Sequence, residues 1–366
     1  MAYYALPRSC ADVRALAAPL SEADRGNSSD SDQPIFIEWP DVSETGVVAM
    51  KEFFVSTSGP VTAGMENWAG TALLGVVAFV VGFTLNHASI CTVIATRELV
   101  AERRPARSIA LVECAVWAGL AYAVLGIAPT MQEGWFPLSH LVPAAILFGF
   151  GTYVNGACVF GSIGHVGNGE TEFGFTLLSI SVVFYIESWF ALLPDQPPIS
   201  ASAPLGAVLL ALALFVLLGL RLSVSLRSRS NFWRLTYSMG AVGITSTILV
   251  ALAPEYSITA SVGTIVSIPV AGAVVLICMF GGSFASARFR RHRFKLRWPT
   301  TKGILKRSFG GILMGLGALM IPGGNDTVLL IGLPMGAWQA VLAYALFVAT
   351  LAALIAMFGS RARSWS

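Results

Sequence analysis

The sequence predicts an all-α polytopic membrane protein, and three observations support this prediction. Of the 366 residues, 55% are apolar and only 12% are charged, whereas soluble domains are about 25% charged. The mean hydropathy is +0.72. Five runs without Asp, Glu, Lys or Arg each reach the roughly 20 residues that a helix needs to cross a bilayer, and they span residues 67–96, 134–169, 196–220, 256–287 and 327–360. This composition excludes a soluble enzyme, a nucleic-acid-binding protein and a disulfide-stapled secreted domain.

Residues 1–66 differ from the rest of the chain. They hold 10 of the 20 acidic residues and a Ser/Asp/Asn-rich stretch at 27–32, but no long apolar run. Such a composition is typical of a disordered tail, and no basic segment followed by an apolar one marks a secretory signal. Met50 and Met65 are alternative starts. We therefore expect a tail that is disordered or that precedes the true start.

About nine transmembrane helices are predicted after this tail. The expected segments are residues 68–92, 107–128, 138–158, 172–194, 203–221, 235–253, 261–284, 305–322 and 335–358. They divide into a first membrane half at 67–194, a connecting helix and cytoplasmic loop at 195–234, and a second membrane half at 235–366.

The positions of Lys and Arg predict how the chain is oriented. After residue 66, all 19 of them lie in or beside four places, namely 97–107, 221–234, 288–307 and 361–363. The connections at 129–137, 195–202, 254–260 and 325–334 contain none. By the positive-inside rule the four basic places are cytoplasmic. This predicts an inner-membrane protein with its N-terminus outside and its C-terminus in the cytoplasm.

Two stretches in the two halves resemble each other. A Gly-x-Gly step, Gly149–Gly151 in the first and Gly315–Gly317 in the second, comes seven residues before a break that contains Gly or Pro. Cys158 then corresponds to Gly324, and in the predicted topology the two motifs run in opposite directions. This is the pattern of an inverted repeat, in which broken helices meet near the bilayer midplane and form the substrate site.

Close helix packing through small residues also explains the Gly-x-Gly steps, but it explains the stretch Gly156–Gly169 poorly. Five glycines in 14 residues would destabilise an ordinary helix by about 1 kcal/mol each relative to Ala. We therefore expect an irregular, site-forming loop here, or a re-entrant segment that imitates a crossing.

This stretch reads GACVFGSIGHVGNG and resembles the GACxxGxxxxxGxG motif of the YeeE/YedE family of sulfur-compound transporters. Two further motifs are similar: Gly82 followed by Cys91, and the run from Gly310 to Ala318 that leads to Pro322–Asp326. The resemblance covers about residues 70–358. It implies a permease for thiosulfate or a related sulfur anion, and a small cytoplasmic sulfur-carrier protein as a partner. The family's third cysteine would fall at Gly324, where this chain has none.

The chemistry of these residues suits a small anion. Helix ends at a break offer free N–H groups and a positive dipole end, and a cysteine S–H is a weak donor that can release its ligand. We expect the pathway to be lined by eight residues: Gly156, Cys158, Gly161, His165, Cys91, Gly323, Gly324 and Asn325. Cys114 and Cys278 lie inside apolar helices and are expected to be structural. No CxxC or other metal-ligand spacing occurs, so neither a metal nor another cofactor is expected.

Two carboxylates, Glu113 and Glu187, interrupt apolar segments. Ionisable residues within the membrane are candidates for proton or cation coupling, although a protonated carboxyl that ties helices together fits equally well. His87 lies near Cys91 and could polarise a thiol or pack against a neighbour.

Three functions are compatible with this pattern. The first is a permease that imports a small sulfur anion, most simply thiosulfate, without chemical change. The second is a membrane-embedded sulfurtransferase or thiol redox protein, in which Cys158 would need a cationic neighbour to lower its pKa. The third is a permease for another small inorganic anion. The duplicated broken segments favour a transporter over an enzyme or a membrane scaffold.

Overall fold

The computed structural model describes most of the chain after residue 67. The described ranges are 68–127, 130–131, 134–190, 193–194, 196–197, 199–200, 207–228, 232–252, 259, 262, 270–290 and 294–359. The predicted tail at 1–66 and the C-terminal Arg361 and Arg363 lie outside them.

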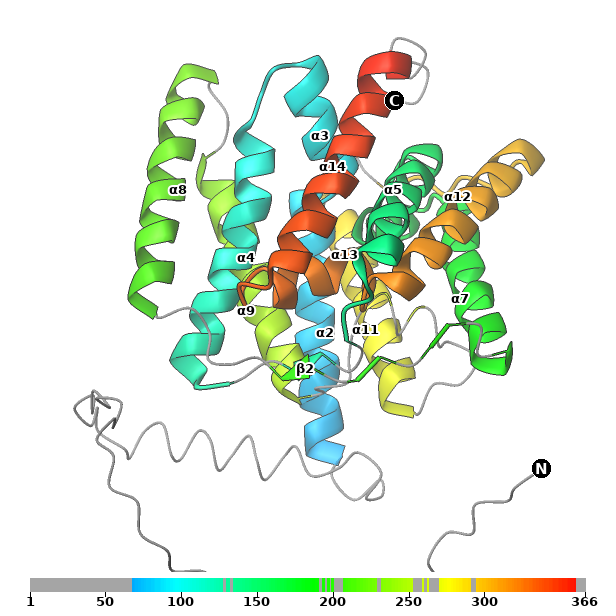
Figure 1. Ribbon diagram of the computed structural model, residues 1–366, viewed down its shortest axis with the longest axis horizontal. Coiled ribbons are helices and arrows are strands. Elements are labelled where there is room, and N and C mark those ends of the chain that lie inside the picture. Colours follow the sequence, from blue (N-terminus) through cyan, green and yellow to red (C-terminus); the bar gives the residue numbers. More distant parts are fainter. Residues whose placement is uncertain are drawn as a thin grey trace, which may run out of the picture. The chain divides into compact units, whose positions relative to one another are not determined.

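Within these ranges the long elements are all α-helices (Figure 1). In chain order they are α2 (Trp68–Ala88), α3 (Thr92–Ala101), α4 (Ala106–Leu125), α5 (Leu138–Asn155), α6 (Val159–Gly167), α7 (Glu172–Phe190), α8 (Ala207–Ser228), α9 (Phe232–Leu252), α11 (Val270–Phe289), α12 (Thr301–Met320), α13 (Gly324–Thr327), the π-helix η2 (Val328–Gly332) and α14 (Trp338–Phe358). Two short strands, β1 (Thr130–Met131) and β2 (Ile199–Ser200), pair antiparallel with Thr130 opposite Ser200.

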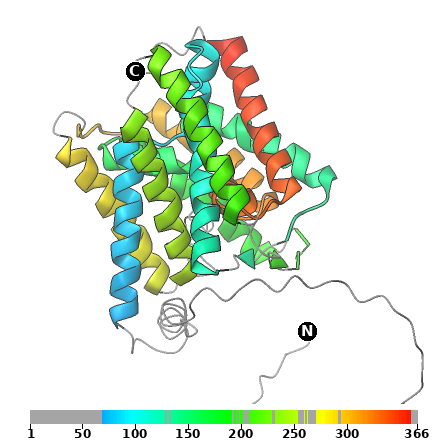
Figure 2. The same cartoon turned by 90° about the vertical axis from the view of Figure 1, so that its left-hand side faces the viewer.

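The all-α membrane architecture predicted from the sequence is confirmed. Six candidate membrane spans lie in the described part of the chain, or seven if the bent pair of α12 with α13 and η2 is one span. Shorter apolar stretches occur in α8, at Leu212–Leu226, and in α11, at Ala273–Phe289. The number of nine crossings stays a prediction. Figure 2 shows α2, α9 and α8 as long rods, as bilayer-spanning helices are; α9 packs against α2, and α8 packs against α4.

Three of the helices are interrupted. The chain leaves α2 through Ser89, whose φ is 52°, and resumes as α3. It leaves α5 through Gly156, whose φ is 80°, and resumes as α6. The third interruption, between α12 and α13, bends the axis by 47°. Each of these breaks gives a second, short helix a new N-terminus inside the fold.

The expectation of an irregular loop over Gly156–Gly169 was wrong for most of that stretch. Within it, residues 156–158 and 168–169 are non-helical, and α6 occupies Val159–Gly167. Close contacts explain two glycines of α6, because a Cβ at Gly161 would lie 2.7 Å from the sulfur of Cys91 and one at Gly167 would lie 2.1 Å from the hydroxyl of Ser283. The physical reason is that neighbouring segments pack closely against the backbone of α6. A count of glycines in the sequence cannot distinguish such packing from an irregular loop.

Glycines also allow helices to cross with their backbones in close contact. A Cβ at Gly82 of α2 would lie 1.9 Å from the carbonyl oxygen of Met279 in α11, and a Cβ at Gly282 of α11 would lie 1.9 Å from that of Phe79 in α2. The crossing of α5 with α12 is similar, since Gly151 faces the carbonyl oxygen of Gly310. The helices α5 and α12 carry the two Gly-x-Gly steps of the predicted repeat.

The connection between α6 and α7 lies beside the most basic loop. The N–H of Lys295 donates to the carbonyl of Asn168 at 3.0 Å, and that of Arg297 donates to the carbonyl of Gly169 at 2.9 Å. The connection itself contains no Lys or Arg. These hydrogen bonds place it on the same side of the fold as residues 295–297.

Candidate functional site

Two cysteine thiols meet where two of the broken helices resume. Cys91 is the N-cap of α3 and Cys158 is the N-cap of α6. Their sulfur atoms are 3.8 Å apart, with the Cys158 thiol donating to Cys91. The side chains are 2% and 0% exposed. The structure therefore brings together two residues that are 67 positions apart in the sequence.

The backbone around this thiol pair is electropositive. The helices α3 and α6, of 10 and 9 residues, both begin at the pair. The first N–H groups of a helix have no partner within it, and the helix dipole adds about half a positive charge at that end. N–H groups from the two first turns, those of Ile94 and Gly161, lie close to the sulfurs. Two converging helix N-termini form a site suited to a small anion.

A small cavity of about 80 Å³, with both polar and apolar walls, adjoins Cys91. Its lining includes Asn86, Ser89, Gly161, His165 and Asn168. The side-chain amide of Asn86 donates to the carbonyl of Gly164 at 2.8 Å, to the side chain of Asn168 at 3.0 Å and to the hydroxyl of Ser283 at 3.2 Å. This network fixes the position of α6 against α2 and α11, and with it the position of the thiol pair.

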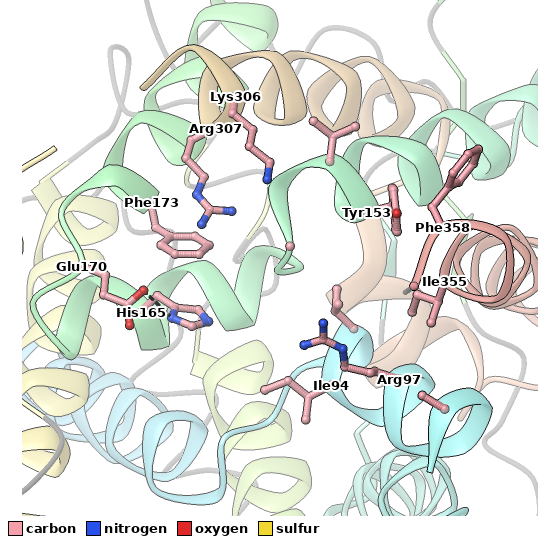
Figure 3. Close-up of a pocket in the computed structure, with 15 residues that line it drawn as sticks. Ile94, Arg97, Tyr153, His165, Glu170, Phe173, Lys306, Arg307, Ile355 and Phe358 are labelled. Atoms are coloured by element: carbon pink, nitrogen blue, oxygen red, sulfur yellow. Dashed lines mark ion pairs between the residues drawn. The ribbon is translucent and has the colours of Figure 1, made fainter. Parts of the chain in front are cut away.

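His165 lies at the border of this cavity. Its Nδ1 is 3.2 Å from a carboxylate oxygen of Glu170, and its ring stacks on that of Phe173 with centroids 4.2 Å apart. Partial burial raises the pKa of Glu170, but the hydrogen bond from His165 and the charges of His165, Arg297 and Arg307 outweigh it, so that this pKa lies below its usual value. Figure 3 shows His165 and Glu170 side by side beneath Phe173.

The third break differs from the other two. Gly323 and Gly324 adopt φ values of 64° and 70°, and a Cβ at Gly324 would lie 2.8 Å from the methyl carbon of Thr259. Asp326 accepts hydrogen bonds from the backbone N–H and the hydroxyl of Thr259. Asn325 borders a separate small cavity beside Tyr344. Gly323 is thus the N-cap of α13, and Gly324 and Asn325 lie in this short helix, which holds no thiol.

The two candidate coupling carboxylates have different surroundings. Glu113 in α4 lies 3.0 Å from a guanidinium nitrogen of Arg221 in α8, and the two side chains are fully buried. Arg221 also donates to the hydroxyl of Thr236 and lies over the ring of Phe232. Glu187 lies in the last turn of α7, where it accepts the backbone N–H of Leu193 at 2.9 Å. A coupling role for either residue stays a prediction.

Sequence reasoning missed several polar residues at the site. Asn86 organises the cavity beside Cys91, and Arg221 pairs with Glu113. Tyr344 of α14 lies next to Thr92, one residue after Cys91. A polar side chain one helical turn before a break, such as Asn86 before Ser89, is the signal that could have identified the first. The other two depend on contacts between distant helices.

Comparison with known proteins gives one finding. A family model described as sulphur transport matches the chain twice, over residues 87–227 and over residues 199–353. No individual curated protein matches the chain. Together the two matches contain all three helix breaks, the thiol pair and the turn at Gly323–Asn325.

Proposed function

The chain belongs to the sulphur-transport (YeeE/YedE) family, and from this premise we propose that it is a permease that imports a small sulfur anion, thiosulfate, past the thiols of Cys158 and Cys91. The family and the helical membrane fold make it a multi-pass membrane protein and a sulfur-compound transporter. The identity of the anion and its path are our proposal.

The observation that carries the proposal is the meeting of two thiols and two helix N-termini at one point. Thiosulfate is a dianion with a terminal sulfur. Weak S–H donors and backbone dipoles can hold it, whereas an arginine would bind a dianion tightly in a medium of low dielectric constant. The buried thiols require the surrounding helices to move apart for an anion to pass, as in alternating access between two repeats.

The proposed orientation of the chain in the membrane rests on the charge distribution. The basic ends of α3 and α12 meet on one side of the fold, since Arg97 and Lys306 line the same cavity. By the positive-inside rule this side is cytoplasmic, which places the N-terminus outside and the C-terminus in the cytoplasm of an inner-membrane protein. A small cytoplasmic sulfur-carrier protein would receive the anion there. The family resemblance alone supports that partner.

Uptake of ³⁵S-labelled thiosulfate into proteoliposomes that contain the full chain tests the proposal. We expect uptake by the parent and a loss of at least about tenfold in Cys158→Ala and Cys91→Ala, because each substitution removes a donor from a buried site. Cys114→Ala is the matched control, since Cys114 is equally buried but lies inside α4. It should keep the parental rate.

The chemical form of the transported sulfur separates the permease from an enzyme. Two thiols 3.8 Å apart could also accept and pass on a sulfur atom, as a membrane sulfurtransferase would. A permease delivers intact thiosulfate to the vesicle lumen, whereas a sulfurtransferase would release sulfite and leave a persulfide on a cysteine. Parental uptake rates in the two thiol variants would refute the thiol-lined path. A folded parent without thiosulfate uptake would refute the proposed substrate, and sulfite would be tested next.

A further inference from the structure

A second, larger cavity lies beside His165. Its volume is about 490 Å³, and it is enclosed by the end of α3, the start of α12, the end of α14 and the segment from His165 to Phe173. Figure 3 shows charged side chains from several of these elements facing one shared space. This cavity, which we call the vestibule, is bordered by Arg97, His165, Glu170, Lys306 and Arg307, together with apolar side chains.

The vestibule adjoins the thiol site. Ile94 and His165 line the vestibule and also the small cavity at Cys91. These two side chains therefore form the partition between the two cavities. An anion that moves from Cys91 across this partition enters the vestibule.

The charge of the vestibule favours an anion. Among the described residues, its lining holds three basic side chains, Arg97, Lys306 and Arg307, and one carboxylate, that of Glu170. This carboxylate is engaged by His165 at 3.2 Å. Glu172, which also acts on Arg307, accepts hydrogen bonds from the N–H and hydroxyl of Thr300. An excess of positive charge within low-dielectric walls concentrates anions.

The aromatic ring of Phe173 positions one of these cations. The guanidinium carbon of Arg307 lies 3.8 Å from the centroid of that ring, and Phe173 stands between Arg307 and His165 (Figure 3). A guanidinium presents a planar set of N–H donors that matches the geometry of an oxyanion. The stack also couples the position of Arg307 to that of the partition residue His165.

We propose that the vestibule is a second binding site for the transported anion, a release station in which Arg97, Lys306 and Arg307 hold a small divalent sulfur oxyanion after it has left the thiols. This inference rests on the proposed function. A phosphate headgroup of an anionic lipid offers the same chemistry, but the partition shared with the Cys91 cavity favours the transported anion.

Thiosulfate flux measured from each face of the membrane tests the release station. Right-side-out and everted vesicles that contain the full chain present opposite faces to the medium. We expect Arg97→Gln and Lys306→Gln to raise the KM about tenfold for flux that starts at the vestibule face, the effect of one lost charge-assisted contact, and to leave the KM from the other face unchanged. Lys302→Gln is the matched control on α12, since Lys302 does not line the vestibule. Equal KM changes from the two faces, or none, would overturn the proposal.

A binding measurement keeps this inference separate from the proposed function. Labelled thiosulfate is bound to the purified full chain in detergent, with unlabelled sulfate as the competitor. The Cys91→Ala and Cys158→Ala variants should still bind it, and the double variant Arg97→Gln/Lys306→Gln in the Cys158→Ala background should lose it. If the parent binds thiosulfate in this way but does not transport it, the proposed function fails and the anion site stands. Absence of binding, or displacement by phosphatidylglycerol but not by sulfate, would refute the site.

Discussion

The carboxylate of Glu113 and the guanidinium of Arg221 form a fully buried ion pair between α4 and α8. Removal of one partner from such a pair leaves an unpaired charge, which typically costs about 3–5 kcal/mol. We therefore expect Glu113→Gln and Arg221→Gln each to lower the thermal unfolding midpoint of the detergent-solubilised protein markedly.

A double variant distinguishes a structural role of this ion pair from a role of Glu113 in proton or cation coupling. Apolar replacements of both partners in a buried ion pair are often neutral, so Glu113→Leu/Arg221→Met should recover most of the parental midpoint. If it also keeps thiosulfate uptake, the pair holds helices together. If it is folded but does not transport, Glu113 has the coupling role that its position in an apolar segment predicts. Two single variants as stable as the parent would contradict the structural argument.

The backbone at Gly324 disfavours the cysteine that the family carries at this position. Its φ of 70° disfavours any side chain, and a Cβ would lie 2.8 Å from Thr259. Gly324→Cys should therefore lower the free energy of unfolding by about 1–3 kcal/mol, the usual cost of such strain, and should not raise thiosulfate uptake. Gly164→Ala is the control for stability. Gly164 has helical backbone and an open Cβ position, so alanine should stabilise α6 by about 0.5–1 kcal/mol. A stable, faster Gly324→Cys variant would contradict this account.

At the residue scale, the sequence singled out Cys91 and Cys158 but not the residues around them. The glycine break before Cys158 is visible in the sequence, whereas the break at Ser89 before Cys91 has no comparable signal. The proximity of the two thiols is not visible in the sequence, because 67 residues separate them. Arg221 begins one of the four basic stretches that the sequence assigns to the cytoplasm. In the structure it is fully buried against Glu113, because α8 continues to Ser228.

At the element scale, the crossing of α2 with α11 depends on two glycines that contact each other's helix backbone. Gly282→Ala would bring a methyl group to 1.9 Å from the carbonyl oxygen of Phe79. We expect it to cost at least the ~1–3 kcal/mol of ordinary overpacking, measured as a lower unfolding midpoint. The adjacent Gly281→Ala is the control, because its nearest neighbour is the ring of Phe79 at 3.8 Å. Equal midpoints for the two variants would show that the helices separate without cost.

The helix breaks show how far element-scale prediction reached. Gly156 ends α5 with a φ of 80°, a conformation that glycine adopts readily. Ser89 ends α2 with a φ of 52°, and no comparable signal in the sequence marks this break. The stretch after Gly156 is helical although it is rich in glycine. Close contacts with Cys91 and Ser283 require glycine at two of these positions. Such tertiary contacts outweigh the low helix propensity of glycine, which suggested a loop.

At the scale of the whole molecule, hydropathy predicted the fold class because a bilayer requires every backbone group in its core to be paired internally. Hydropathy alone leaves the number of crossings open, since interrupted helices such as α12 and α13 resemble one span or two. The family model matches the chain over residues 87–227 and again over residues 199–353. The inverted repeat stays a prediction.

The orientation of the molecule can be tested at two exposed positions on opposite sides. Ser139 lies at the start of α5 and Thr301 at the start of α12. In a background that lacks Cys10 and Cys278, we expect a membrane-impermeant maleimide to label Ser139→Cys in intact cells, and to label Thr301→Cys only after permeabilisation, because the basic loop before Thr301 belongs in the cytoplasm. The reverse pattern would place the vestibule outside the cell, and the same cations would then capture the anion before it reaches the thiols.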